Sequence, residues 1–90
     1  MNYNKLYEIR QYAKTDWVPI LKEDTQFFLE DLLKKIKPKT ILEVGTAIGF
    51  SSLVFSEVLC DNVFIDTIEI DESRIKTAED NIKSFGKTNI

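Results

Sequence analysis

Apolar positions near the start of the chain recur at helical spacing. Leu6, Ile9 and Ala13 lie three and four residues apart, which predicts a first helix. This helix is expected to end near Asp16, because the Trp17-Val18-Pro19 segment that follows favours an extended or turned backbone.

A second and clearer helical pattern follows. Asp24 and Thr25 are both good residues for capping its start, and Pro38 ends it. Charged residues such as Glu30 fall largely on one side, which indicates an amphipathic helix. The apolar residues that share its other face are Phe28, Leu29, Leu32, Leu33 and Ile36.

The pattern changes at residue 40 to an alternation of strands and helices. Strands are predicted over 40–44 and 63–70, and helices over 51–59 and 71–85. Asp71 and Ser73 can cap the last helix, and Gly86 ends it.

This order predicts the fold class. It is α/β: N-terminal helices over 1–38, followed over 39–90 by the first two βα units of a Rossmann-like parallel sheet. Residues 88–90 resemble the approach to a third strand, so the chain is expected to be a fragment with an incomplete domain. Parallel strands that are buried on both faces need neighbours, and we therefore expect marginal stability or a homo-oligomer formed through the open edges.

Composition narrows the function classes. Ninety residues, 43% hydrophobic and 30% charged, suffice for one core. A net charge of −3 disfavours nonspecific nucleic-acid binding. Without histidine, and with Cys60 as its one cysteine, the chain has no internal disulfide, Cys/His metal cluster or Ser-His-Asp triad, and a cytoplasmic protein is expected. The first ten residues predict neither a secretory signal nor a membrane span.

Small residues follow the first predicted strand at the place where open parallel sheets bind ligands. Gly45, Thr46, Ala47 and Gly49 form a tight loop between the strand and the start of a helix. Glu69 lies twenty residues beyond Gly49, at the end of the second strand, where a carboxylate can accept both hydroxyl protons of a ribose. An adenosine-containing ligand would lie across the two strand ends.

Two other nucleotide motifs fit less well. The dinucleotide fingerprint needs G-x-G-x-x-G, whereas the small residues here are spaced equally by two. Gly86-Lys87-Thr88 looks like the end of a phosphate-binding loop, but it follows a helix and has Asn81 where the first glycine belongs. We interpret it as a helix stop.

The loop carries a family resemblance. Ile41 to Ser51 resembles the first motif of class I methyltransferases, and its Gly-Thr-Ala-x-Gly-aromatic-Ser form is similar to small O-methyltransferases of the catechol and caffeoyl-CoA type. Val18-Pro19-Ile20 and Thr67 to Asp71 also resemble bacterial members, including those that methylate 5-hydroxyuridine in transfer RNA. The resemblance covers nearly the whole chain.

The resemblance implies S-adenosylmethionine as cofactor. Glu43 and the loop backbone would hold its methionine end, Ser51 its carboxylate, and Glu69 its ribose hydroxyls, while Val18 would lie over it. The divalent-metal ligands of that family come later in the chain than residue 90, so no metal ligand or catalytic residue is expected here. The implied cofactor-binding residues are Val18, Glu43, Gly45, Thr46, Ala47, Gly49, Ser51, Glu69 and Ile70.

The function predicted is that of the cofactor-binding N-terminal part of an S-adenosylmethionine-dependent O-methyltransferase. The fragment itself is expected to be inactive, and the complete enzyme to methylate a small hydroxylated molecule or a modified tRNA base. Two alternatives remain open: a noncatalytic module that binds adenine nucleotides, and a structural or assembly domain whose loop binds nothing.

Some residues have simpler interpretations. Ser51 can serve as a helix cap, and Asp71 is expected to cap the last helix rather than touch a ligand. Cys60 is expected to be a small apolar filler. The aromatic residues near the N-terminus are expected to pack in the core: Tyr3, Tyr7, Tyr12 and Trp17.

Overall fold

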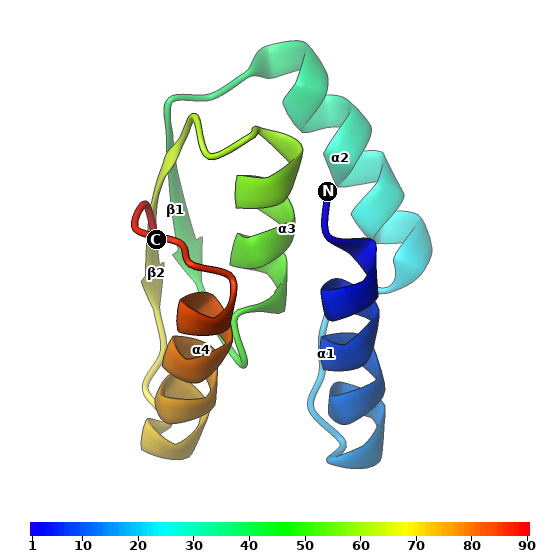
Figure 1. Cartoon of the computed structure of the whole chain (residues 1–90), viewed down its shortest axis with the longest axis vertical. Coiled ribbons are helices and arrows are strands. Elements are labelled where there is room, and N and C mark those ends of the chain that lie inside the picture. Colours follow the sequence, from blue (N-terminus) through cyan, green and yellow to red (C-terminus); the bar gives the residue numbers. More distant parts are fainter.

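The computed structural model describes residues 1–90, and it confirms the predicted α/β class. Its two strands form a parallel sheet in which Thr40 lies opposite Phe64 and Val44 opposite Ile68. The strands alternate with helices from residue 40 onward (Figure 1). The elements are α1 (Tyr3–Thr15), α2 (Glu23–Ile36), β1 (Thr40–Val44), α3 (Phe50–Val58), β2 (Phe64–Ile68) and α4 (Glu72–Ser84).

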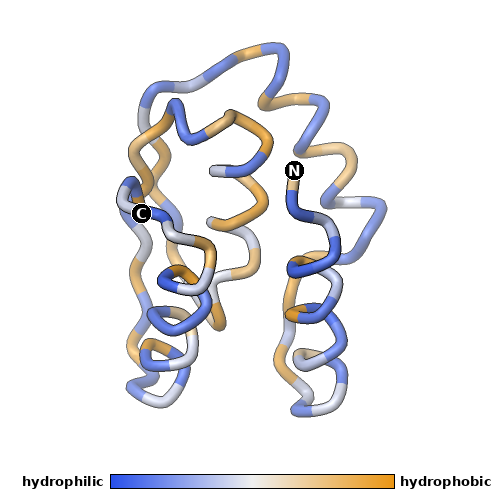
Figure 2. Tube along the Cα trace, viewed as in Figure 1, coloured by the Kyte–Doolittle hydropathy of each residue, from blue (hydrophilic) through white to orange (hydrophobic).

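Helix α3 lies at the centre of the molecule. It stands between the sheet and the pair α1 and α2 (Figure 1), and it is largely apolar along its length (Figure 2). Leu53 and Val54 are fully buried in it, because apolar partners surround this helix from both sides. The buried core cluster consists of Leu6, Ile9, Ala13, Leu33, Ile48, Phe50, Leu53, Val54 and Val58.

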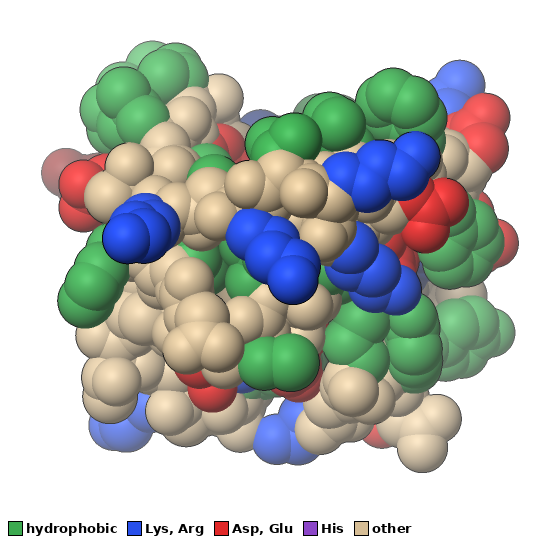
Figure 3. Space-filling model, turned by 90° about the horizontal axis from the view of Figure 1, so that it is seen from above, with side chains coloured by type: hydrophobic (Ala, Val, Ile, Leu, Met, Phe, Trp, Pro, Cys, Tyr) green, Lys and Arg blue, Asp and Glu red, His purple; other side chains and the backbone are tan.

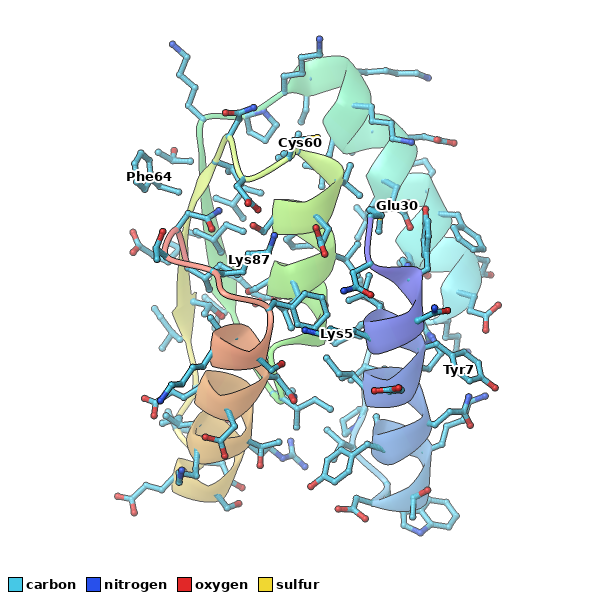
Figure 4. All side chains as sticks on the ribbon, in the orientation of Figure 1. Lys5, Tyr7, Glu30, Cys60, Phe64 and Lys87 are labelled. Atoms are coloured by element: carbon cyan, nitrogen blue, oxygen red, sulfur yellow. The ribbon has the colours of Figure 1, made fainter.

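One face of the sheet is not covered by any helix. Side chains alternate across a strand, so Ile41 and Ile65 face the helices while their neighbours face away. Figure 4 shows Phe64 pointing away from all four helices. The exposed apolar side chains of this outer face are Leu42, Val44, Phe64 and Ile68.

The starts of the helices differ in how they are capped. Asp71 caps α4 as predicted, since its carboxylate accepts the N–H groups of Ser73 and Arg74. The prediction that Asp24 or Thr25 caps the start of α2 is wrong. The N-cap is Lys22, two residues before Asp24, because the Gln26 N–H donates to the Lys22 carbonyl at 2.9 Å and closes the first turn there.

The buried face of α2 also differs from the apolar face predicted for it. Phe28 and Ile36 are exposed, and the buried side chains are Gln26, Glu30 and Leu33. The reason is that α1 presents polar side chains to α2, and these pair with the glutamine and the glutamate. A hydrogen-bonded polar group can occupy a buried position that would otherwise favour an apolar one.

The predicted burial of the N-terminal aromatic residues and of Cys60 is wrong. Trp17 is 90% exposed, and the remaining three are also exposed: Tyr3, Tyr7 and Tyr12. Trp17 and Cys60 both have a left-handed backbone, with φ of 57° and 53°. They lie where α1 and α3 end, so their side chains turn outward instead of continuing the buried helical faces.

The last residues of the chain are tied to α3 and β2. The Lys87 side chain is only 6% exposed, and its ammonium group pairs with Glu57 and Asp61. The Asn89 carbonyl accepts the Ile65 N–H at 2.8 Å on the edge of β2 that faces away from β1. Residues 88–90 form no strand, but this hydrogen bond lies where a neighbour of β2 would pair.

The end of the molecule where α2 stops is basic. Figure 3 looks down on this end and shows basic side chains beside hydrophobic ones. Lys34 and Lys35 lie in the last turn of α2, where positive charge stabilises the helix dipole. The loop after β1 lies at the opposite end (Figure 1). None of the four helices combines the length and apolar character that crossing a membrane requires.

Replacing Asp61 with asparagine tests the attachment of the last residues. The hydrogen bond from Lys87 holds the pKa of Asp61 below its usual range, so this carboxylate stabilises the fold above about pH 4 and loses that effect as the pH falls through its folded pKa. We expect Asp61→Asn to lower the free energy of unfolding by about 1 kcal/mol at pH 7. Urea denaturation at pH 7 and at pH 3 measures this difference, which is expected to shrink at the lower pH.

Asp80→Asn is the matched control, because Asp80 pairs with Lys76 on the exposed side of α4. Such a surface pair contributes less than about 0.5 kcal/mol. Equal effects of the two substitutions at pH 7 would contradict the role given to Asp61.

Candidate functional site

The loop after β1 depends on left-handed backbone conformations. Gly45 and Gly49 have φ of 98° and 87°, which side chains disfavour, and Ala47 between them has φ of 49°. A Cβ atom on Gly49 would also lie 3.5 Å from Ala78 of α4. The N–H groups of Gly45 and Thr46 both donate to the Ile68 carbonyl, at 2.8 and 3.1 Å, so the loop is joined to the end of β2.

Glu43 lies beneath this loop, in the middle of a hydrogen-bond network. Its Oε1 accepts the hydroxyl groups of Ser52 at 2.7 Å and Thr67 at 2.8 Å. The Thr67 hydroxyl also lies 2.5 Å from that of Thr46. Glu43 therefore connects β1, β2 and α3 directly below the loop.

Glu69 follows β2 immediately, and its carboxylate binds the backbone of the loop after β1. Its Oε1 accepts the Ala47 N–H at 2.8 Å, and its Oε2 accepts the N–H groups of Ile70 and Asp71, each at 3.1 Å. The Asp71 and Ala47 N–H groups contribute most to holding the pKa of Glu69 below its usual range. The side chain is thus a carboxylate at neutral pH, at the carboxyl edge of the sheet.

A hollow of about 340 Å³ lies between the loop and the segment that joins α1 to α2. The first turn of α3 opens onto it through Phe50 and Ser51, whose N–H groups make no backbone hydrogen bond. Free N–H groups at a helix start favour an anion such as a carboxylate. The lining residues are Pro19, Ile20, Leu21, Glu43, Gly45, Thr46, Ala47, Phe50 and Ser51.

A second hollow, of about 440 Å³, lies between β2 and α4. Glu69 lines it, and Thr46 lines both hollows, so the loop separates them. A ligand that lay along the carboxyl ends of both strands would pass this point.

Not all of the predicted cofactor-binding residues lie at the first hollow. Val18 is half-buried against the core, with its N–H bonded to the Ala13 carbonyl, and it is not a lining residue. Ile70 is 93% exposed and lines neither hollow, and Gly49 lies behind the loop against α4.

Sequence reasoning missed other residues at this place. Ile20 and Leu21 line the first hollow, whereas only their neighbour Val18 was predicted there. Ser52 and Thr67 hold Glu43. Ser52 lies just beyond the first motif, and Thr67 begins the segment Thr67 to Asp71 of the family resemblance, but neither was predicted to have a role. The alternation along β2 offers one signal, because Thr67 is a polar residue at a position that faces the helices.

No group of three or more His, Cys, Asp or Glu side chains in residues 1–90 is arranged to hold a metal ion. The arrangement is instead that of a binding loop: two glycines, a helix start with free N–H groups, and an ionised carboxylate at the end of the next strand. Such a loop can hold and orient a ligand.

Comparison with known families agrees with this geometry. The model of the O-methyltransferase family matches residues 3–89. The chain belongs to this family. The family match and the α/β fold agree with the resemblance that the loop carries.

This O-methyltransferase chain is similar to parts of several solved structures. A Staphylococcus aureus protein proposed to be a caffeoyl-CoA O-methyltransferase is 33% identical, with a TM-score of 0.88 over 93% of this chain and 40% of that one. A methyltransferase of Podospora anserina with bound S-adenosylhomocysteine (SAH) is 25% identical, with a TM-score of 0.85 over 93% and 38%. An O-methyltransferase of Bacillus cereus in complex with SAH is 26% identical, with a TM-score of 0.76 over 89% and 37%. The chain thus spans about two fifths of the length of these proteins.

Replacing Ser52 with alanine tests the network beneath the loop. Ser52 is fully buried, and its hydroxyl donates to Glu43, so its loss leaves that carboxylate with one hydroxyl donor. We expect Ser52→Ala to lower the free energy of unfolding by about 1–2 kcal/mol in urea denaturation. Ser84→Ala, at an exposed hydroxyl that bonds a carbonyl of its own helix, is the control and should change little. Equal stability of both variants and wild type would argue against the network.

Proposed function

We propose that this chain is the cofactor-binding N-terminal part of an S-adenosylmethionine-dependent O-methyltransferase. Membership of the family and the SAH bound to two of the similar structures support the choice of cofactor. The observation that carries the proposal is the Glu69 carboxylate, which is ionised and held beside the glycine loop by the Ala47 N–H.

The two hollows suit the two ends of the proposed ligand. The methionine end would occupy the hollow beside the first turn of α3, where the free N–H groups of Phe50 and Ser51 suit its carboxylate. The ribose would lie next to Glu69, whose oxygens still have room to accept a hydroxyl proton in addition to the three N–H groups. Glu43 would support the loop from below.

Methyl transfer depends more on the alignment of donor and acceptor than on acid–base catalysis. The sulfonium of the cofactor is already activated, and the enzyme must hold an oxygen nucleophile in line with the methyl carbon. Residues 1–90 can orient this donor. We propose that the acceptor, a small hydroxylated molecule or a modified tRNA base, is bound by other parts of the complete enzyme, as is any divalent metal, and that the present chain alone transfers no methyl group.

Isothermal titration of the 90-residue chain with S-adenosylmethionine and SAH tests the proposal. We expect both to bind, and we expect Glu69→Ala to weaken SAH binding about 10- to 100-fold, because a carboxylate that accepts hydroxyl protons contributes a charge-assisted hydrogen bond. Glu8→Ala, at an exposed carboxylate on α1, is the matched control and should bind as wild type does. Circular dichroism confirms that each variant is folded.

The same titration separates the alternatives. A noncatalytic module would bind adenosine diphosphate as tightly as SAH, because it would not use the methionine end. A structural domain would bind neither ligand. Either result, obtained with folded wild-type protein, would contradict the proposed cofactor role of this chain.

We also propose that the chain self-associates through its incomplete sheet. The outer face is apolar and exposed, and β1 has an unpaired edge. Sedimentation velocity is expected to show concentration-dependent association that Phe64→Lys, at a side chain 73% exposed on the outer face, reduces at least severalfold. Phe28→Lys on α2, also exposed, is the control. A monomer at all concentrations would contradict this proposal.

A further inference from the structure

A chain of polar side chains joins α1 to α2 inside the molecule. Arg10 donates to the Oε1 of Gln26 at 2.6 Å, the Nε2 of Gln26 donates to Glu30 at 3.0 Å, and the Tyr3 hydroxyl donates to Glu30 at 3.0 Å. Arg10, Gln26 and Glu30 are each less than a tenth exposed. The buried charges of Arg10 and Glu30 are thus connected through the glutamine amide rather than by direct contact.

Arg10 also reaches the wall of the first hollow. Its Nη1 donates to the Leu21 carbonyl at 2.6 Å, and its guanidinium carbon lies 4.7 Å from the centre of the Phe50 ring. Leu21 and Phe50 both line that hollow. Arg10 itself does not line it, so the side chain supports the wall from behind.

The segment over 18–22, which we name the strap, has few other attachments. At its start the Val18 N–H donates to the Ala13 carbonyl, and at its end the Lys22 carbonyl accepts the Gln26 N–H. Between these points no backbone N–H of the strap makes a backbone hydrogen bond, and Arg10 is the side chain that holds it. A charge-assisted hydrogen bond in a buried place is strong enough to define where the strap lies.

We propose that Arg10 is a positioning residue of the cofactor site. Its planar guanidinium holds the strap by the Leu21 carbonyl and, by stacking on Phe50, fixes the distance between the strap and the start of α3. The width of the hollow therefore depends on a residue that touches no ligand. This inference rests on the proposed function for its effect on affinity, but its effect on the strap is independent of any ligand.

The experiment separates positioning from general stability. Arg10→Met keeps the length of the side chain and removes its donors, but it leaves Glu30 charged and buried. The double variant Arg10→Met/Glu30→Met removes that unpaired charge, and such replacement of buried ionic groups by apolar ones often restores stability. Arg10→Lys keeps the charge but loses the fork that reaches two acceptors. Tyr3→Phe removes a hydrogen bond from the far end of the network and is the control.

Two measurements are made on each folded variant. Methyl NMR of Ile20 and Leu21 in the ligand-free protein reports the position and order of the strap, and titration with SAH reports affinity. We expect the double variant to unfold near the wild-type urea concentration, yet to show shifted strap methyl signals and SAH binding weakened about tenfold. Arg10→Lys is expected to show the same changes to a smaller extent, and Tyr3→Phe neither.

The outcomes are distinct. Wild-type strap signals and affinity in the double variant and in Arg10→Lys would overturn the role of Arg10. Absence of SAH binding by folded wild type would instead contradict the proposed function, and the NMR comparison with Tyr3→Phe would then decide the positioning role: shifted strap signals support it, and unchanged signals overturn it.

Discussion

Burial of α3 is the constraint on which the rest of the structure depends. This helix is apolar on most sides, so it is stable only when the sheet covers one side and the pair α1 and α2 another. Because α3 starts immediately after the glycine loop, its packing also determines where Phe50 and Ser51 present their free N–H groups. The core and the candidate site thus share one element.

The polar groups around α3 follow from the same packing. Glu43 lies between the sheet and α3, where two hydroxyl groups satisfy its Oε1, and Arg10 lies between α1 and α3, where a carbonyl, an amide and an aromatic ring surround it. Neither is left without a partner, as burial of charged groups demands. In both places at least one polar contact reaches a residue that lines the first hollow, so the interior network extends to the candidate site.

Much of the fold was predictable from local signals. The strand–helix alternation from residue 40 follows from short β-branched runs bounded by glycine and by turn residues, and Asp71 caps α4 as its side chain chemistry favours. Of the site, the loop and the Glu69 position could be predicted, since a fixed spacing places both at the carboxyl edge of a parallel sheet. The place of the strap residues Ile20 and Leu21 at the first hollow could not be predicted, because an irregular segment has no periodicity that indicates which of its side chains face a hollow.

The sequence by itself determined the order of the elements and the glycine loop, because these depend on local periodicity and on backbone preferences of single residue types. The parallel pairing of the two strands then follows from the general rule for strand–helix–strand units. Only the tertiary structure decided which face of α2 is buried and which groups Arg10 contacts. Gln26 and Glu30, rather than the apolar residues predicted for this face, are buried at the α1 interface because side chains of α1 pair with them. A pairing between residues sixteen or more positions apart leaves no local pattern in the sequence.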